Sequence, residues 1–569
     1  LVGAFFAFAI WIGFGLLALY DLGKSVDRKK LTEYLLYSGI IMILFFITGL
    51  TVYDFDSFIA LLVYAGIIIM VLSLISGALF RSMKNEKMAV IILTVICLSA
   101  PILMGSQGWD DHNRHGRTLA RDFAKNYLES CPQNAILFTQ GDNDTYPLWY
   151  AQEVEGIRTD IRIINLSLLG VDWYINQLRH ATNDAGKIDL LLGSEKILGD
   201  KRNAIRFDKN SKFKNRTLDL KEMVMFMGND KQEALNAQGE NYIPSQNIKV
   251  TVDSASVAVN NVVDESLKSR IVNEMNFTLN NTTLLKNDLM LLDIVASNIS
   301  KRPICFAITV SPDANLGLDK YFMQTGMAYR VTPVENEGNG FNKAANTDIT
   351  YDLLVNHEEL FNYGGVETGE NMHLDPSSEG SILTSKYVNY QQLAGDLIQE
   401  KMNYEQQASQ MLSPQTDASL NEVGNGLQEL AKERSAMALT VMDLMMKNFP
   451  ASSFPYDYNM INAANYYQML GNNEKALEII KVLKEICLDD LEYYYKMYNN
   501  SAENFLTRVQ YESDMRDAER CLASAVNVAK KANDTELSTS IQQEWNSLRT
   551  SNNLPSILDE KPATPLPGQ

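Results

Sequence analysis

Apolar residues fill four long blocks within the first 104 positions, and the charged residues of this stretch lie between them. The blocks are residues 1–20, 34–52, 58–80 and 88–104. Each approaches the roughly 20 residues that a helix needs to cross the hydrocarbon core of a bilayer. The pattern therefore predicts four transmembrane helices, because buried helices of a large soluble protein seldom follow one another with charges only in the connections.

The charges between the blocks predict how these helices are oriented. Residues 21–33 and 81–87 contain seven lysines and arginines together, whereas residues 53–57 carry only Asp54 and Asp56 as charged groups. Positively charged loops face the cytoplasm, so we expect everything after about residue 105 to lie outside it. Trp109 stands where an interfacial aromatic residue is expected. The prediction is a multi-pass protein of the inner (cytoplasmic) membrane with its C-terminal domains in the periplasm.

Short apolar runs alternate with amphipathic stretches from residue 135 onward, which is typical of an α/β domain. This order predicts a parallel sheet. We expect Pro147 in the first turn of one helix, capped by Asp144 or Thr145. The expected elements are strands at 135–139, 160–166 and 302–308, and helices at 148–154, from 172 onward and at 284–297.

The remaining sequence suggests an insertion, a linker region and a helical domain. The α/β domain spans residues 105–350, and a polar, Asn-rich insertion with weak strand signals such as 248–252 occupies about 181–283. Residues 351–412 show no clear periodicity, so we interpret them as an irregular linker region.

Residues 413–550 have a helical period. Tyr467, Gly471 and Ala476 follow the spacing of a tetratricopeptide (TPR) repeat, in which small residues let two helices approach closely; an unrelated helical hairpin is the alternative. The proline-rich tail at 551–569 is expected to be disordered.

Composition divides the chain and excludes one class of partner. Of the 569 residues 46% are hydrophobic and 21% charged, which excludes a disordered chain. Residues 1–104 hold 7 Lys/Arg against 6 Asp/Glu, and the rest holds 43 against 63. An acidic body without a basic patch argues against nucleic-acid binding.

The five cysteines are scattered without CxxC spacing, so they indicate neither a zinc site nor a disulfide framework. The chain begins with Leu1 inside an apolar run, without a basic region before it. We therefore expect it to be an N-terminally truncated fragment.

The first candidate site lies at the carboxyl end of the first predicted strand. Ligands of open α/β sheets bind at this edge, where a helix N-terminus offers free N–H groups. Carboxylates flanking an amide suit a divalent cation or sugar hydroxyls, and their spacing also fits the DxD of nucleotide-sugar glycosyltransferases. Helix capping alone is the competing interpretation. The candidate acceptor-binding residues are Asp142, Asn143, Asp144, Tyr146 and Trp149.

The second candidate site follows the fourth apolar block. Arg114, Arg117 and Arg121 share one face if this stretch is helical, and guanidinium groups bind phosphate in a bidentate way. We therefore regard these arginines as candidate lipid-phosphate ligands. A metal cluster of Asp111, His112 and His115, or a plain solvated helix start, are the alternatives; we assign no metal site.

Other polar groups carry weaker signals. Asp54 and Asp56 suit a catalytic base near a lipid-linked donor, but the simpler interpretation is that they are solvent-exposed loop residues. His180, His357 and His373 are isolated and receive no role. The sequence has no Gly-rich phosphate loop, no Ser-His-Asp order and no HExxH motif.

Four segments of the sequence resemble a known family. They are WDDHNRHGRTLARDFAKNYL from Trp109, AILFTQGDNDTYPLWYAQEVEGIRTDIRIINLSLL from Ala135, LLKNDLMLLDIVASNISKRPICFAI from Leu284 and GLDKYFMQTGMAYRV from Gly317. These segments resemble the DUF2723 membrane-protein family of Bacteroidota, which is related to the TMEM260-type protein O-mannosyltransferases of the GT-C superfamily. The resemblance covers roughly residues 1–335, and a TPR tail is a usual companion.

The resemblance implies an enzyme that takes a sugar from a polyprenyl-phosphate carrier and transfers it to an acceptor outside the cytoplasm, with a protein as the expected acceptor. The four apolar blocks would then be the end of a GT-C-like membrane domain. The family's catalytic carboxylate lies in an earlier external loop, which we expect this fragment to lack, so the catalytic residues are unknown and the fragment itself is expected to be inactive.

The partners that this interpretation implies are the lipid membrane, the sugar donor and an acceptor protein. No cofactor is certain, and a divalent cation is the one candidate. The alternative from another class is a non-catalytic envelope assembly or scaffold protein that binds a protein partner through its α/β and TPR-like domains. The sequence does not reveal the sugar, the acceptor or the oligomeric state.

Overall fold

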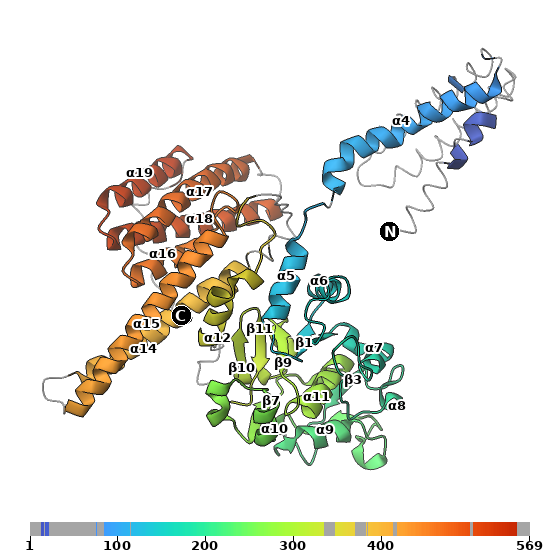
Figure 1. The fold of residues 1–569 in the computed structure, drawn as a ribbon, viewed down its shortest axis with the longest axis vertical. Coiled ribbons are helices and arrows are strands. Elements are labelled where there is room, and N and C mark those ends of the chain that lie inside the picture. Colours follow the sequence, from blue (N-terminus) through green and yellow to red (C-terminus); the bar gives the residue numbers. More distant parts are fainter. Residues whose placement is uncertain are drawn as a thin grey trace. The chain divides into compact units, whose positions relative to one another are not determined.

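The structure, a computed structural model, divides the chain into two compact units, Leu1–His115 and Gly116–Gln569 (Figure 1). Each unit is described by itself. The residues described are 13–15, 17–21, 75–76, 83, 85–113, 115–334, 347–369, 380, 383, 385–412, 418–500, 505–552 and 554.

The main element of the first unit is helix α4 (Glu86–His112), whose N-cap Asn85 accepts a hydrogen bond from the Lys87 backbone N–H. Within the described part of the chain, no helix has the length and apolar character needed to cross a bilayer. The predicted membrane-spanning fold is therefore wrong where it can be examined, at residues 88–104. Ala89 and Leu93 of α4 are buried, whereas Ile91 is exposed. Val95 and Ile102 of α4 are exposed as well. The prediction rested on apolar composition, whereas a membrane span also needs a helix of sufficient continuous apolar length.

The other three predicted membrane helices, at 1–20, 34–52 and 58–80, lie almost entirely outside the described residues. Asp54 and Asp56 lie outside them as well.

A five-stranded sheet forms the centre of the second unit, in the order β10-β11-β9-β1-β2. Strand β1 pairs in parallel with β2 and β9, and β11 pairs antiparallel with β9 and β10. Every residue of β1, β2 and β9 is buried, as expected for parallel strands covered on both faces. The strands are β1 (Ile136–Thr139), β2 (Arg162–Asn165), β9 (Ile304–Ala307), β10 (Phe322–Thr325) and β11 (Ala328–Val331).

The predicted strands at 135–139, 160–166 and 302–308 thus match β1, β2 and β9, but the sheet is mixed because β11 and β10 add antiparallel pairs. The helices of this domain are α5 (Leu119–Glu129), α6 (Asp142–Glu153), α7 (Asp172–Gln177) and α11 (Lys286–Asn298). Ten of the residues of α11 are buried, so this helix lies within the core.

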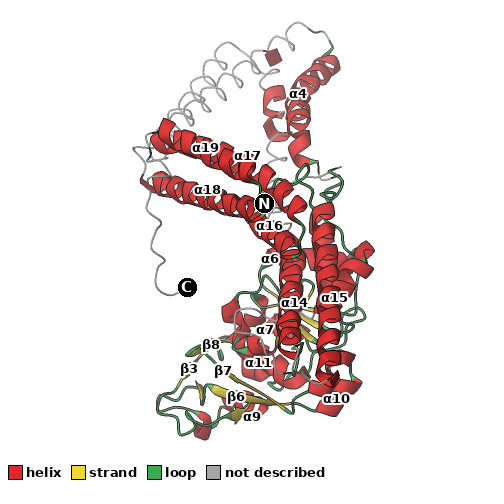
Figure 2. Cartoon of the chain, turned by 90° about the vertical axis from the view of Figure 1, so that its left-hand side faces the viewer, coloured by secondary structure: helices red, strands yellow, loops and turns green. Residues whose placement is uncertain are grey.

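Between α7 and α11 the chain forms two small three-stranded sheets, β5-β3-β8 and β4-β6-β7. Figure 2 shows β6 and β7 beside α9. These elements occupy the region expected as an insertion. They are α8 (Ser194–Ile197), β3 (Ala204–Phe207), β4 (Leu218–Asp219), α9 (Leu220–Met227), β5 (Tyr242–Ile243), β6 (Asn247–Thr251), α10 (Ser254–Val259), β7 (Glu274–Thr278) and β8 (Thr283–Leu285).

The C-terminal part of the unit is helical. A π-helix (Ser385–Gln391) leads directly into α14, although no helix was expected before residue 412. The predicted hairpin at Gly471, whose φ is +81°, joins α16 to α17. The helices are α12 (Thr347–Tyr351), α14 (Gln392–Met411), α15 (Ala418–Asn448), α16 (Met460–Met469), α17 (Asn473–Asn500), α18 (Phe505–Lys531) and α19 (Thr535–Ser551).

Helices α16 and α17 have 10 and 28 residues, so their unequal lengths leave the TPR assignment a prediction. Helices α14 and α15 lie side by side as a long hairpin (Figure 2).

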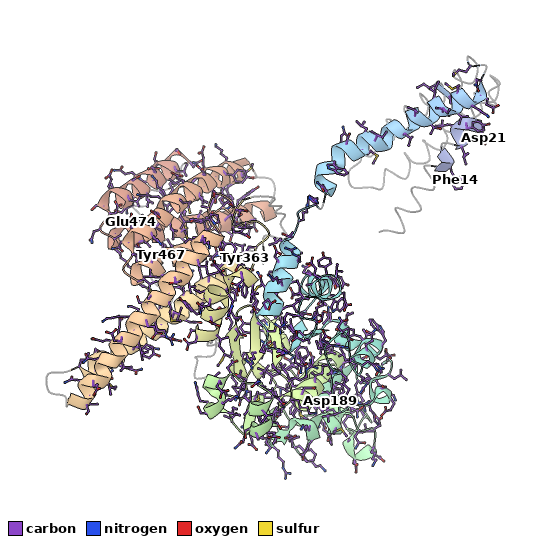
Figure 3. All side chains as sticks on the ribbon, in the orientation of Figure 1. Phe14, Asp21, Asp189, Tyr363, Tyr467 and Glu474 are labelled. Carbon is purple, nitrogen blue, oxygen red and sulfur yellow. The ribbon has the colours of Figure 1, made fainter. Side chains whose placement is uncertain are left out.

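Two hydrophobic cores stabilise this unit. The first spans buried residues from Phe123 to Val334, and the second spans Leu354 to Ile541. The hydroxyls of Tyr363, labelled in Figure 3, and Tyr390 share a 2.6 Å hydrogen bond inside the second core.

Helix α5 connects the α/β part to the chain that follows it. The side chain of Asn126 donates to the Asn362 carbonyl at 2.9 Å, and its oxygen accepts from the Asn362 N–H at 3.2 Å. Asp122 accepts a hydrogen bond from the Gly364 N–H at 3.1 Å.

Candidate functional site

The connections of the parallel strands diverge at β1 and β9. The chain leaves β1 through α6 toward β2, whereas it leaves β9 toward the opposite edge of the sheet, where β11 and β10 lie. Ligands of open α/β sheets bind at such a switch point, beyond the carboxyl ends of the strands. The residues that follow β1 and β9 therefore define the candidate site.

Helix α6 begins earlier than the sequence suggested. Its N-cap is Gly141, with φ of +83° and no side-chain cap, and Pro147 lies inside the helix. The expected capping by Asp144 or Thr145 is therefore wrong. The left-handed backbone of Gly141 turns the chain sharply after β1, and this turn places residues 142–144 in the first turn of α6.

The side chain of Asp144 reaches from the turn after β1 to the loop after β9. Its carboxylate accepts the hydroxyl of Thr309, which follows β9. Tyr127 of α5 is fully buried and donates its hydroxyl to Thr309 at 3.3 Å. Thr309 itself is exposed, so its hydroxyl lies between a buried carboxyl group and solvent.

A second hydrogen bond joins the same two loops. Gln140 accepts the N–H of Ser311 through Oε1 at 2.8 Å. Asp144 is only 7% exposed. This burial raises the pKa of its carboxyl group, while hydrogen bonds from Thr309 and from the Gln140 backbone oppose the shift.

Hydrogen bonds also connect the turn after β1 to the end of the neighbouring strand β2. The Thr139 and Thr145 hydroxyls lie 2.7 Å apart, and Thr145 donates to the Gly141 carbonyl at 2.7 Å. Asn165, at the end of β2, donates to Thr145 Oγ1 at 2.9 Å and to the Gly141 carbonyl at 3.2 Å. The turn is therefore held in place before any ligand arrives.

The remaining predicted acceptor-binding residues lie on the surface of this turn. Asp142 and Asn143 are exposed, and Tyr146 is 53% exposed. Trp149 is half-buried against the first core, and its ring centroid lies 5.6 Å from that of Tyr146. Acidic, amide and aromatic groups thus surround the buried Asp144, an arrangement that suits hydroxyl-bearing ligands.

Arg117 and Arg121, the two described arginines of the predicted face, do not lie on one helix. Helix α4 ends at His112, and α5 begins at Leu119. Arg117 lies in the connection, while Arg121 on α5 donates to Asp122 through Nε and Nη2 at 2.9 and 2.7 Å. Arg114 lies outside the described residues. Phosphate binding by these residues stays a prediction.

No group of three or more potential metal ligands occurs in the part of the chain that the structure describes. Sequence reasoning missed Tyr127, Gln140, Asn165, Thr309 and Ser311. Only Thr309 and Ser311 had a usable signal, because they follow a predicted parallel strand at the same edge as Asp144.

Two comparisons with known proteins relate this chain to TMEM260 proteins. Residues 120–350 match the family model of TMEM260-associated domain 2. The chain is 29% identical over 87 residues to the protein O-mannosyl-transferase TMEM260 of Mus musculus. This match covers 15% of the chain and 12% of the mouse protein. No solved structure matches the chain. The two matches support a TMEM260-like family.

Proposed function

We propose that the chain is part of a glycosyltransferase of the protein O-mannosyltransferase type, and that its α/β domain binds the acceptor. The mouse relative is named for the transfer of mannose to protein, and the matched family model covers the whole α/β domain. We further propose a polyprenyl-phosphate-linked mannose as donor and a protein acceptor outside the cytoplasm, as the resemblance implies.

The observation that carries this proposal is the exposed rim around Asp144. The side chains of Asp142 and Asn143 are exposed and are free to accept and donate hydrogen bonds to a ligand at this turn, and Tyr146 offers an exposed ring. A protein acceptor presents serine or threonine hydroxyls within an extended segment. Carboxylates and amides bind hydroxyl and backbone groups, and an exposed ring packs against apolar side chains or sugar faces.

The buried Asp144 organises this rim. Because its carboxyl group holds Thr309 and lies beside the first turn of α6, it fixes the loops after β1 and β9 relative to each other. We assign it a positioning role. Asp142 and Asn143 are the groups that contact the acceptor in this proposal, and transfer itself depends on residues outside the α/β domain.

The test uses the full-length protein that contains this chain, polyprenyl-phosphate mannose and a serine/threonine-rich peptide as acceptor. Asp142→Asn and Tyr146→Ala should raise KM for the peptide with kcat nearly unchanged. Loss of a charge-assisted hydrogen bond, worth about 1.5–3 kcal/mol, corresponds to roughly a tenfold or greater effect for Asp142. The matched control is Asp319→Asn, which changes an exposed aspartate elsewhere in the same domain.

Two results would contradict the proposal. If both variants transfer mannose with the KM of the wild type, the rim does not bind the acceptor. If the full-length protein transfers no mannose yet binds a protein partner through this domain, the non-catalytic assembly function is favoured instead.

A further inference from the structure

Two buried arginines lie at the amino ends of the parallel strands, the end opposite to Asp144. Arg162 is the first residue of β2, and Arg302 stands two residues before β9; each is 7% exposed. The Ala135 carbonyl accepts the backbone N–H of Arg162 at 2.9 Å and Nη2 of Arg302 at 3.4 Å. The guanidinium group of Arg302 therefore lies beside the backbone of Arg162.

The same two guanidinium groups hold one surface loop, residues 177–188. Arg162 donates through Nη2 to the Gln177 carbonyl at 3.2 Å, and Arg302 donates through Nη1 to the Gly186 carbonyl at 3.1 Å. A backbone hydrogen bond of 2.8 Å joins the two sides of the loop, and the residues at its tip are exposed. Both cationic side chains therefore bind the same solvent-exposed loop.

Neither arginine is paired with a carboxylate among the residues that the structure describes. Asp160 and Asp189 are the acidic residues whose charges act on Arg302. Asp160 pairs with Arg158 at 2.9 Å, and Asp189, labelled in Figure 3, pairs with Lys301 at 2.6 Å. These two carboxylates are occupied by other cations, so the buried guanidinium groups carry uncompensated positive charge.

One of the two groups also has an open hydrogen-bond donor. Nη1 of Arg162 is buried and has no hydrogen-bond partner, whereas every side-chain nitrogen of Arg302 donates to a carbonyl. Both groups stay charged at neutral pH. Burial and the charge of Arg162 lower the pKa of Arg302, but only to about 10.

The missing partner has to supply negative charge. A water molecule would accept the open N–H but would not balance two buried charges, which are costly without a counter-charge. A phosphate or sulfate ion needs several donors for its oxygens, whereas the described residues offer one buried open donor here. A small spherical anion fits one donor and two neighbouring charges.

We propose that Arg162 and Arg302 hold a monovalent anion of the size of chloride beneath the loop 177–188. Nη1 of Arg162 donates to the anion, and Arg302 contributes its charge. The anion reaches the site from the exposed loop. Because it lies between the loop and the amino ends of the strands, it stabilises the attachment of the loop to the sheet.

The experiment follows urea unfolding of the 569-residue chain in chloride-free buffer at pH 7. Sodium chloride replaces sodium gluconate stepwise at constant ionic strength, because gluconate is a monovalent anion too large for this site. Once chloride exceeds its Kd, each tenfold increase should raise the folding equilibrium constant of the wild type about tenfold. The chlorine NMR line should also broaden in the presence of the native protein, which reports binding directly.

Arg162→Met removes the open donor and one charge but keeps an unbranched side chain. Gln177 is exposed, so water replaces the lost donor at its carbonyl. Without chloride this variant should be more stable than the wild type, because it buries one uncompensated charge fewer. Its stability should not respond to chloride, and it should not broaden the chlorine line. The matched control is Arg206→Met, which changes an exposed arginine of β3 and should keep the full response.

Three results would overturn the proposal. Equal wild-type stability in chloride and gluconate, without line broadening, would leave water as the partner of Arg162. A chloride response that Arg162→Met retains would place the anion elsewhere. A sulfate response that exceeds the chloride response and is lost in Arg162→Met would show an oxyanion site. If Arg162→Met does not fold, Arg162→Lys, which keeps the charge but not Nη1, should bind chloride at least tenfold more weakly; unchanged affinity would contradict the role of Nη1.

Discussion

The hydroxyl of Thr309 donates to the carboxylate of Asp144, so the loop after β9 is fastened to the first turn of α6. The two residues are far apart in the sequence, and their contact joins the two connections at the switch point of the sheet. A capping role for Asp144 would have made it a local feature of α6. Its contact with Thr309 makes it a link between the two connections that frame the candidate site.

Replacing Asp144 with asparagine should change how stability depends on pH. Because burial raises the pKa of this carboxyl group above 3.8, the folded chain keeps its proton at pH values at which the unfolded chain has released it. Its contribution to the free energy of unfolding is therefore greatest below pH 3.8 and is lost as pH rises through the folded pKa.

In urea titrations, the unfolding free energy of wild type relative to that of Asp144→Asn should accordingly fall as pH rises above 4. The control Asp142→Asn changes an exposed side chain and should alter stability by no more than about 0.5 kcal/mol at pH 7. A difference between wild type and Asp144→Asn that stays constant with pH would contradict this explanation.

Lys386 should be a destabilising residue at neutral pH. Its Nζ is buried and has no hydrogen-bond partner among the described residues, and it lies 5.2–5.6 Å from the ring centroids of Tyr387, Phe454 and Tyr456. Burial lowers its pKa to about 8, and the charge of Asp457 opposes the shift. Lys386→Met should therefore raise the free energy of unfolding at pH 7 by about 1–3 kcal/mol.

The sign of the pH effect is opposite to that of an ion-paired lysine. Between pH 8 and 10.5 the unfolded chain binds a proton that the folded chain has lost, so wild-type stability gains from Lys386 as pH rises. The advantage of Lys386→Met should consequently disappear by pH 10. An advantage that is unchanged over this range would mean that the amine does not titrate as inferred.

Lys286→Met should have the opposite effect on stability. Lys286 is 3% exposed, and its Nζ donates to the carbonyls of Ile197, at 3.0 Å, and Gly199. Methionine would leave the buried Ile197 carbonyl, and the Gly199 carbonyl beside it, without this donor, at a cost of about 1–3 kcal/mol. Guanidinium denaturation of both lysine variants provides the comparison. If Lys286→Met were as stable as wild type, water would have to replace the amine at these carbonyls.

Gly317 should tolerate alanine less well than Gly156. Both residues have positive φ, +86° and +68°, where a Cβ costs roughly 1–2 kcal/mol. A Cβ on Gly317 would also lie 2.4 Å from the Thr278 carbonyl oxygen, whereas one on Gly156 meets nothing within 4 Å. Gly317→Ala should therefore lower the urea midpoint more than Gly156→Ala, and equal midpoints would show that the loop shifts freely.

The sequence predicted those elements whose hydrophobic pattern is local. Strands β1, β2 and β9 and helix α11 lie within about two residues of their expected positions, because each is a buried apolar run that needs no distant partner to be identified. The edge at which Asp142, Asn143 and Tyr146 lie followed from the strand order. Their role as ligands was not tested.

Contacts between distant segments could not be predicted from the sequence. The start of α6 was misplaced because proline usually occupies a first helical turn, whereas this helix begins at Asp142, five residues before Pro147, after the N-cap Gly141. Thr309 and Tyr127 carry no motif, so their contacts with the site were not foreseen. At α4 the error was to predict a membrane span from apolar composition, since no described helix has the length and apolar character needed to cross a bilayer.

The reciprocal hydrogen bonds between Asn126 and Asn362 have a practical consequence for dividing the protein. The domain limits expected from the sequence invite cloning of residues 105–350 as a separate piece. That piece would leave the buried carboxamide of Asn126 with neither its donor nor its acceptor, and Asp122 without the Gly364 amide. A boundary after residue 369 would keep these contacts but divide the second core, in which Tyr363 is bonded to Tyr390, so the α/β part is better expressed together with the helical part.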